Sequence, residues 1–173
     1  ETMGVDVMRW MYCAHNPRLD LHFGYGPADE VRRRFLIPLW NIYSFFTTYA
    51  NIDGWTPQRM EAPDLQTQPT NLLDRWILSR LQVLIKEVTE RMDDYDCAPA
   101  ARRIETFVDD LSNWYVRRSR RRFWKSEQDE DKNVAYWTLY RCLVTLVKLL
   151  APFIPFITEE VYQNLVRTVD ADE

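Results

Sequence analysis

The chain has 173 residues with a formal net charge of −4; 46% of them are hydrophobic and 14% aromatic, which is enough for one domain with a substantial core. The net negative charge excludes a protein that binds nucleic acid over its whole surface. The chain has only four glycines, and this low number disfavours a turn-rich β architecture. Scattered cysteines and the lack of any apolar run of roughly 20 residues argue against a disulfide framework, a zinc site and a membrane span, so we expect a cytoplasmic protein with reduced cysteines and no membrane partner.

The first half of the chain predicts two helices. Residues 5–15 are apolar nearly all round, which indicates a short buried helix, and residues 19–23 alternate like a brief extended segment. A long helix is expected over residues 28–49, bent at Pro38. Its predicted inward face consists of Leu36, Leu39, Trp40, Tyr43, Phe46 and Ala50. Residues 51–70 are rich in proline and poor in aliphatic residues, which predicts a long loop.

Four further helices follow. Asn71 is the expected N-cap of a helix that ends near Asp94, with Asp74 as the acidic residue three positions on, and Asp96 can cap the next helix. The remaining predicted helices cover residues 98–124, 133–150 and 156–169, with an acidic turn at 127–131. Without interruption, 98–124 would be roughly 40 Å long at ~1.5 Å per residue. No internal repeat or convincing β-sheet is present, so the sequence predicts an all-α fold, an antiparallel α-helical bundle.

Residues 111–126 form the one strongly basic stretch of an acidic chain. They contain no Asp or Glu, and their cations are Arg117, Arg118, Arg120, Arg121, Arg122 and Lys125. The preceding apolar stripe has helical spacing and consists of Ile104, Phe107, Val108, Leu111, Trp114 and Tyr115. The same spacing continues on Arg118 and Arg122, which cannot lie in an apolar core without partners. The helix is therefore expected to begin inside the core and to end outside it.

Aromatic residues accompany these cations. Phosphate-binding charge beside the rings of Trp114, Tyr115, Phe123 and Trp124 is the combination expected of a protein that reads single-stranded or loop RNA. The alternative is a solvated helix face neutralised by the flanking carboxylates, which are Asp109, Asp110, Glu127, Asp129, Glu130 and Asp131. Arginine favours RNA binding, because its planar guanidinium makes bidentate phosphate contacts and stacks on bases.

The sequence predicts no active site. His15 and His22 are the only histidines, and neither lies near a nucleophile or carboxylate in a catalytic arrangement. The four glycines cannot form a phosphate-binding loop.

Several segments resemble the isoleucyl-tRNA synthetases. Residues 113–124 (NWYVRRSRRRFW) are similar to the signature of their tRNA-binding helical domain, and 74–81 (DRWILSRL) to a segment shared by the isoleucyl, valyl and leucyl enzymes. Residues 151–162 contain APFIPF and EEVY, similar to the family's closing motif. Residues 4–10 resemble the Gly-Ala-Asp-Ala-Leu-Arg motif that follows the catalytic domain, with Val5, Val7 and Met8 as departures. Residues 35–46 also fit the isoleucyl pattern, including Trp40-Asn41.

The resemblance implies a fragment of a class I aminoacyl-tRNA synthetase. Both ATP-binding signatures, the His-Ile-Gly-His and Lys-Met-Ser-Lys-Ser types, are missing from the sequence. We therefore expect a linker helix and extended segment over 1–26, after the catalytic domain, and an anticodon-binding bundle over 27–173. Such a fragment would lack the aminoacylation and editing sites and be inactive by itself, with no cofactor of its own; ATP with magnesium would serve the full-length enzyme. Its expected partners are tRNA and the rest of the synthetase chain in cis, in a monomer.

The resemblance also implies roles for individual residues, because related enzymes contact anticodon bases from two neighbouring helices. The matching regions are Asn41 with Phe45, and the helix around Trp114. Trp114 and Trp124 would stack on bases, and Asn41 and Asn113 would read base edges. The phosphate-holding or stacking residues would be Arg117, Arg118, Arg120, Arg121 and Arg122.

Each reading has an alternative. Trp114 lies beside the apolar stripe and could pack in the core, and Asn41 could bond to another helix. Trp76 and Trp137 are expected in the core. For the whole chain, the alternatives to the isoleucyl assignment are the same domain of a valyl enzyme, whose corresponding segment is less basic, and a structural helical domain that docks a protein partner. The effect of salt on binding separates these alternatives, because RNA binding through several phosphates weakens steeply with salt and docking through an aromatic surface does not.

Overall fold

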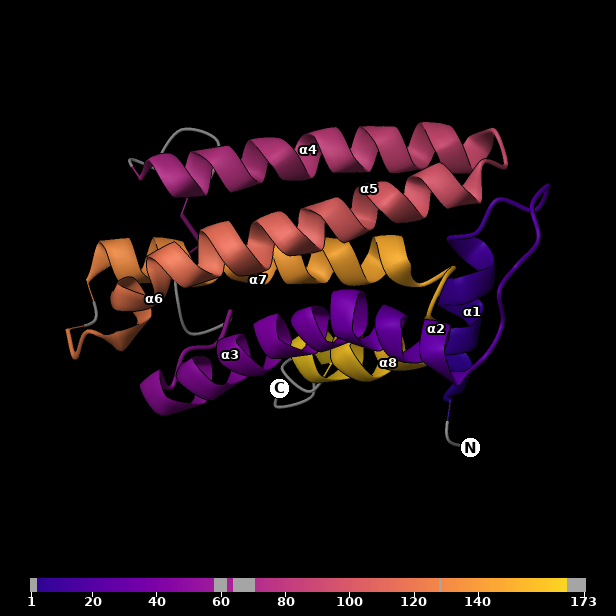
Figure 1. Ribbon diagram of the computed structural model, residues 1–173. Coiled ribbons are helices and arrows are strands. Elements are labelled where there is room, and N and C mark those ends of the chain that lie inside the picture. Colours follow the sequence, from indigo (N-terminus) through magenta and orange to yellow (C-terminus); the bar gives the residue numbers. More distant parts are fainter. Residues whose placement is uncertain (1–2, 58–61, 64–70, 128, 168–173) are drawn as a thin grey trace.

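The computed structural model describes residues 3–57, 62–63, 71–127 and 129–167. Within these ranges the chain forms helices and no strand, so the all-α prediction is confirmed. The elements are α1 (Val5–Cys13), α2 (Tyr25–Val31), η1 (Arg32–Leu36), α3 (Ile37–Asp53), α4 (Leu72–Asp93), α5 (Cys97–Asp109), η2 (Asp110–Val116), α6 (Arg117–Trp124), α7 (Glu130–Leu150), α8 (Pro155–Tyr162) and η3 (Gln163–Arg167), where η denotes a π-helical segment. Figure 1 shows α4 and α5 running side by side, with α7 and α3 below them, α1 at one end of the bundle and α6 at the other.

Local capping explains where α4 begins. The side chain of Asn71 accepts a hydrogen bond from the backbone N–H of Leu73 at 3.0 Å, which satisfies one of the free donors of the first turn and confirms the predicted N-cap. Asp96 was predicted to cap the next helix with its side chain, and this is wrong. Asp96 precedes α5 but makes no capping bond with its side chain, because its carboxylate pairs with Arg91 at 2.9 Å.

The helix predicted over 28–49 begins earlier, at Tyr25, and runs through α2, η1 and α3 to Asp53. The turn before Pro38 is π-helical, at a place where proline lacks an N–H donor and crowds the preceding turn. Trp40 was expected to face inward, and this is wrong, since 47% of it is exposed. The buried residues of α3 are Leu39, Ile42, Tyr43, Phe46 and Ala50. The helix ends at Gly54, which adopts the left-handed conformation (φ 62°) that glycine tolerates best.

The main core lies between α3, α4, α5, α7 and η2, and α7 contributes most of its length to it. Trp76 and Trp137, expected in the core, are partly buried against it. The expected loop over 51–70 is helical up to Asp53, and most of its remainder lies outside the described residues. The final helix is confirmed as α8 and η3 up to Arg167, and residues 168–169 likewise lie outside them.

The N-terminal helix is anchored by Trp10. Its ring is fully buried and stacks on Phe35 at 3.9 Å, and its Nε1 donates to Glu105 Oε1 at 3.0 Å. The short helix is therefore confirmed, but the expectation that it is buried all round is wrong, because Val5 and Tyr12 face solvent. The segment at 19–23 forms no strand. Across the part of the chain that the structure describes, no helix has the length and apolar character needed to cross a membrane.

Candidate nucleic-acid interface

The basic stretch lies on one continuous helical path through α5, η2 and α6, as predicted. The path is π-helical over Asp110–Val116, and a π-helical turn takes in about one more residue than an α-helical turn. An α-helix continued from the buried Leu111 would bring Arg118 to the core. Because the π-helical turn holds one more residue, the position that faces the core after it is Ser119 and not Arg118, and Phe123 is buried one turn later. Arg118 is thereby turned to solvent.

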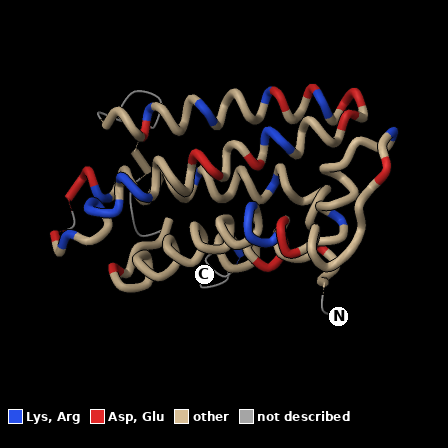
Figure 2. Tube along the Cα trace, in the orientation of Figure 1, with Lys and Arg blue, Asp and Glu red and all other residues tan. Residues whose placement is uncertain are grey.

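The outward face of η2 and α6 combines charge with flat rings. Its exposed residues are Asn113, Trp114, Arg117, Arg118, Arg120, Arg121 and Trp124. Figure 2 shows these cations gathered at the α6 end of the bundle. Trp114 is 49% exposed, which contradicts the alternative that it packs in the core. Every predicted site residue on this helix except Arg122 therefore reaches solvent.

The flanking carboxylates do not neutralise this face. Asp109 accepts a hydrogen bond from Asn113 at 2.6 Å, Asp110 pairs with Arg80 at 3.0 Å, and Asp129 pairs with Lys125 at 2.6 Å. The exposed arginines form no ion pair with any residue that the structure describes; they are Arg117, Arg118, Arg120 and Arg121. Their charge is available to an anionic ligand.

Trp114 and Arg118 form a pair on this surface. The guanidinium carbon of Arg118 lies 4.7 Å from the centroid of the Trp114 ring, which is within the range of a cation–π interaction. The two residues are one helical turn apart, so this contact orients the exposed indole on the helix face. Asn113 is oriented in the same way by its bond to Asp109.

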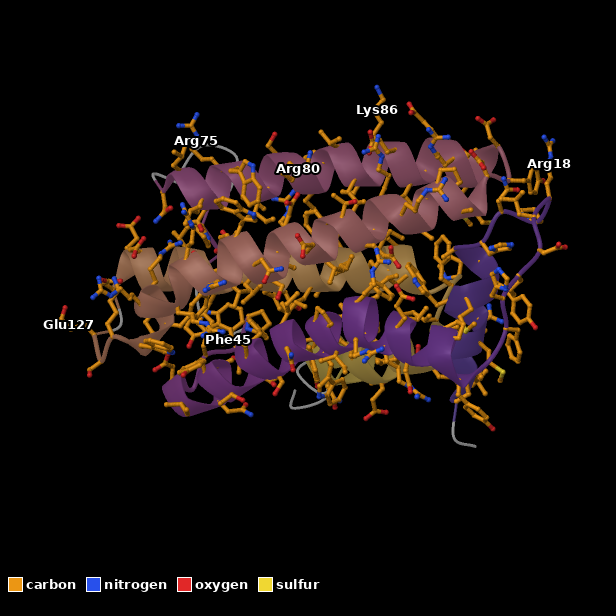
Figure 3. The ribbon with its side chains drawn as sticks, in the orientation of Figure 1. Arg18, Phe45, Arg75, Arg80, Lys86 and Glu127 are labelled. Atoms are coloured by element: carbon orange, nitrogen blue, oxygen red, sulfur yellow. The ribbon has the colours of Figure 1, made fainter. Side chains whose placement is uncertain are left out.

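Helix α3 borders the basic helix through Phe45. The Phe45 ring packs edge-on against Phe123 of α6, with 5.2 Å between centroids, and lies tilted against Tyr49 at 4.8 Å. Figure 3 labels Phe45 on α3. Phe45 is therefore half-buried in the seam between the helices. Asn41 lies one turn earlier on α3 and is exposed, and its side chain makes no hydrogen bond within the described ranges, so the alternative of a bond to another helix is not found. The structure brings together the two regions that motif matching selected.

Arg122 has a different environment from its neighbours. Only 8% of it is exposed, and its guanidinium binds both carboxylate oxygens of the fully buried Asp74, at 2.7 and 2.8 Å. It also pairs with Asp131 at 2.8 Å. The expectation that Arg122 would need partners in order to lie at the core is met, and its guanidinium is occupied by protein carboxylates. Sequence reasoning missed Asp74 as its partner; the signal available was an acidic residue inside the apolar stripe of α4.

The surroundings of Asp74 shift the pKa values of Arg122, Tyr115 and Asp131. Burial would lower the pKa of Arg122, but hydrogen bonds to Asp74 raise the pKa above its ordinary value. Burial and then the adjacent Asp74 carboxylate raise the pKa of Tyr115 well above its ordinary value. The pKa of Asp131 would be raised by burial, but it is held below its ordinary value by its bond to Arg122. Arg122 therefore stays charged and Tyr115 stays protonated.

The described residues offer no catalytic or metal-binding arrangement. Within them, no group of three His, Cys, Asp or Glu side chains could hold a metal ion. The Nε2 atom of His15 lies 2.8 Å from the carbonyl oxygen of Leu19, a local turn contact, and His22 is exposed.

Comparison with known proteins identifies the family of this chain. Residues 74–173 match the family model described as the anticodon-binding domain of tRNA ligase. The chain is 56% identical over 172 residues to an isoleucine–tRNA ligase of Dehalococcoides mccartyi, covering 96% of the chain, and 49% identical over 171 residues to one of Clostridium tetani, covering 98% of it. It is 47% identical over 168 residues to that of Thermus thermophilus, covering 96% of the chain. The chain spans 16% of the length of each of these relatives.

Proposed function

Because the chain belongs to the family of anticodon-binding domains of tRNA ligases, we propose that it is the module of an isoleucine–tRNA ligase that binds the anticodon stem-loop of tRNA. All three relatives described above are isoleucine–tRNA ligases, which favours the isoleucyl enzyme over the valyl one. A helical domain that only docks a protein partner is not favoured, because the family match concerns tRNA ligases.

One observation supports the proposal above the others: four exposed arginines, which have no carboxylate partner among the residues that the structure describes, lie beside two exposed tryptophans on a single helical path. Arg117 and Arg121 are one turn apart on α6, as i and i+4 positions are, and can contact successive phosphates. Trp114 and Trp124, about half exposed, offer flat surfaces for unpaired bases.

Other residues take narrower roles in the proposal. Asn41 and Asn113 are exposed amides that can hydrogen-bond base edges, from α3 and η2 respectively. Phe45 packs between α3 and α6 and keeps the two surfaces adjacent. Arg122 is buried in its ion pair with Asp74, so we do not include it among the residues that contact RNA.

The proposal places attachment of isoleucine, with ATP and magnesium, on other parts of a longer synthetase chain. This module would lie in cis with those parts, in a monomeric cytoplasmic enzyme. Its own contribution is to hold the anticodon stem-loop. Contacts to the bases would discriminate between tRNAs, and contacts to the phosphates would supply affinity.

The direct test is a competition experiment with the chain and a labelled tRNA that carries the isoleucine anticodon. Unlabelled versions of this tRNA, identical except for the anticodon loop, are added as competitors. We expect the isoleucine loop to compete roughly 100-fold better than a loop with three changed bases, since each mismatched position in a specific site typically costs at least ~1 kcal/mol and separate positions add. Equal competition by all loops, or no binding at low salt by the folded chain, would refute the proposed function.

A further inference from the structure

One buried carboxylate holds the basic helix at two points. Tyr115 Oη donates to Asp74 Oδ1 at 2.7 Å, and Arg122 donates to the same oxygen at 2.7 Å and to Oδ2 at 2.8 Å. Tyr115 lies inside the π-helical segment η2, whereas Arg122 lies in the α-helical turn beyond it. Asp74 on α4 therefore spans the junction at which the π-helical path becomes α6.

Hydrophobic burial alone does not explain the register at this junction. The apolar stripe of α5, continued by α-helical spacing, would direct Trp114 toward the core and Arg118 after it. The structure leaves Trp114 about half exposed and buries Tyr115, Ser119 and Phe123. Exposing a large ring forfeits favourable burial, so another interaction must offset this loss. In the observed register Arg122 makes a bidentate bond to Asp74, and Tyr115 bonds to the same carboxylate.

We propose that Asp74 and Tyr115 are positioning residues for tRNA binding. Acting through Arg122, they hold η2 and α6 in the register that turns Trp114 and the exposed arginines to solvent. Asp74 and Tyr115 are fully buried and do not touch the RNA themselves. This inference rests on the proposed function, since it assigns Asp74 and Tyr115 a role in shaping the same RNA-binding surface.

A positioning role differs measurably from a purely stabilising one. A residue that only stabilises the fold changes the melting temperature, while molecules that remain folded keep all their phosphate contacts. A residue that sets the register changes which cations face the ligand. The slope of log K against log salt then changes as well, because it reports the number of phosphates contacted.

The test uses two conservative variants, Asp74→Asn and Tyr115→Phe, and one matched control, Tyr136→Phe. Tyr136 is also buried with its hydroxyl bonded to a carboxylate, that of Asp53, but it lies on α7. Binding of tRNA with the isoleucine anticodon is measured across a salt series, well below each melting temperature. We expect Asp74→Asn to bind about tenfold more weakly, with a slope shallower by about 0.7 per lost phosphate contact. Tyr115→Phe should shift in the same direction by less, and Tyr136→Phe should match the native chain.

A second measurement does not depend on RNA. Hydroxyl-radical footprinting of the free chain reports solvent access at Trp114, and we expect oxidation there to fall in Asp74→Asn and Tyr115→Phe but not in Tyr136→Phe. If the native chain binds no tRNA, the proposed function fails while this footprint still tests the register. Unchanged oxidation of Trp114 in both folded variants overturns the positioning role. If Asp74→Asn does not fold, the comparison of Tyr115→Phe with Tyr136→Phe decides in the same way.

Discussion

Arg118 places its guanidinium carbon 4.7 Å from the centroid of the Trp114 ring, and both side chains face solvent. An exposed indole beside a cation provides, at one point, a stacking surface for a base and a positive charge for its phosphate. The pair exists because the π-helical segment η2 moves both residues out of the apolar stripe in which α-helical spacing would place them.

Removing the Trp114 ring should weaken RNA binding with little effect on the fold. Base–aromatic stacking contributes ~1–3 kcal/mol per base, so Trp114→Ala should lose roughly 5- to 150-fold in tRNA affinity. Thermal melting should stay close to native, since half of the ring is already exposed. Trp114→Phe retains a ring and should lose less. Fluorescence anisotropy with labelled tRNA makes the comparison, and native affinity in Trp114→Ala would contradict the stacking role.

Arg121 and Arg122 are neighbours in sequence but should differ sharply in their effect on stability. Arg122→Ala leaves the buried Asp74 carboxylate without its charged partner, which typically costs about 3–5 kcal/mol of unfolding free energy. Arg121→Ala removes an exposed side chain and should change the unfolding free energy by no more than about 0.5 kcal/mol. Urea unfolding at neutral pH measures both. Similar losses in the two variants would show that the buried pair contributes no more to stability than an exposed arginine does.

Stability should decline in alkaline solution partly through Tyr115. Burial, and then the Asp74 carboxylate, raise the pKa of this phenol in the folded state, so the folded chain keeps a proton that the unfolded chain releases above about pH 10. The unfolded state then binds fewer protons, and the unfolding free energy contributed by this group falls by about 1.4 kcal/mol per pH unit above that value.

Urea unfolding between about pH 8 and pH 11 tests this contribution. The contribution is fully present below the unfolded pKa, so Tyr115→Phe, which loses the bond to Asp74, should be less stable than the native chain by a constant amount below about pH 10 and should decline less steeply above it. Tyr12→Phe removes an exposed hydroxyl and serves as the control. Identical alkaline slopes in Tyr115→Phe and the native chain would rule out the contribution.

The helices were largely predictable because their signals are local. Asn71 before an amphipathic run marks the start of α4, and the apolar spacing after residue 133 marks α7. Trp40 shows where such signals fail. Tyr43 and Ile42 already fill the inward face of α3, and the large Trp40 ring lies at its edge, tilted against Tyr43 at 5.2 Å. A hydropathy pattern alone cannot decide which of two adjacent aromatic residues faces inward.

The candidate site was predicted as a set of residues but not in its register. Local charge and aromatic content were sufficient to select Trp114 and Arg118. Their outward direction depends on a π-helical turn and on the bond from Tyr115 to Asp74, which lie 41 positions apart in the chain. The same long-range bond separates Arg122 from the arginines beside it. Neither effect is contained in the spacing of residues along one helix.

Binding of tRNA across a salt series by two charge-matched double variants tests whether the exposed face of α6 contacts RNA. Arg117→Ala/Arg121→Ala removes two cations from the proposed face, and Arg33→Ala/Arg102→Ala removes two exposed cations from η1 and α5. If the face of α6 binds phosphates, the first variant should bind more weakly, with a log–log salt slope shallower by about 1.4, and the second should keep a near-native slope. Equal slopes in the two double variants would contradict the assignment of RNA binding to this face.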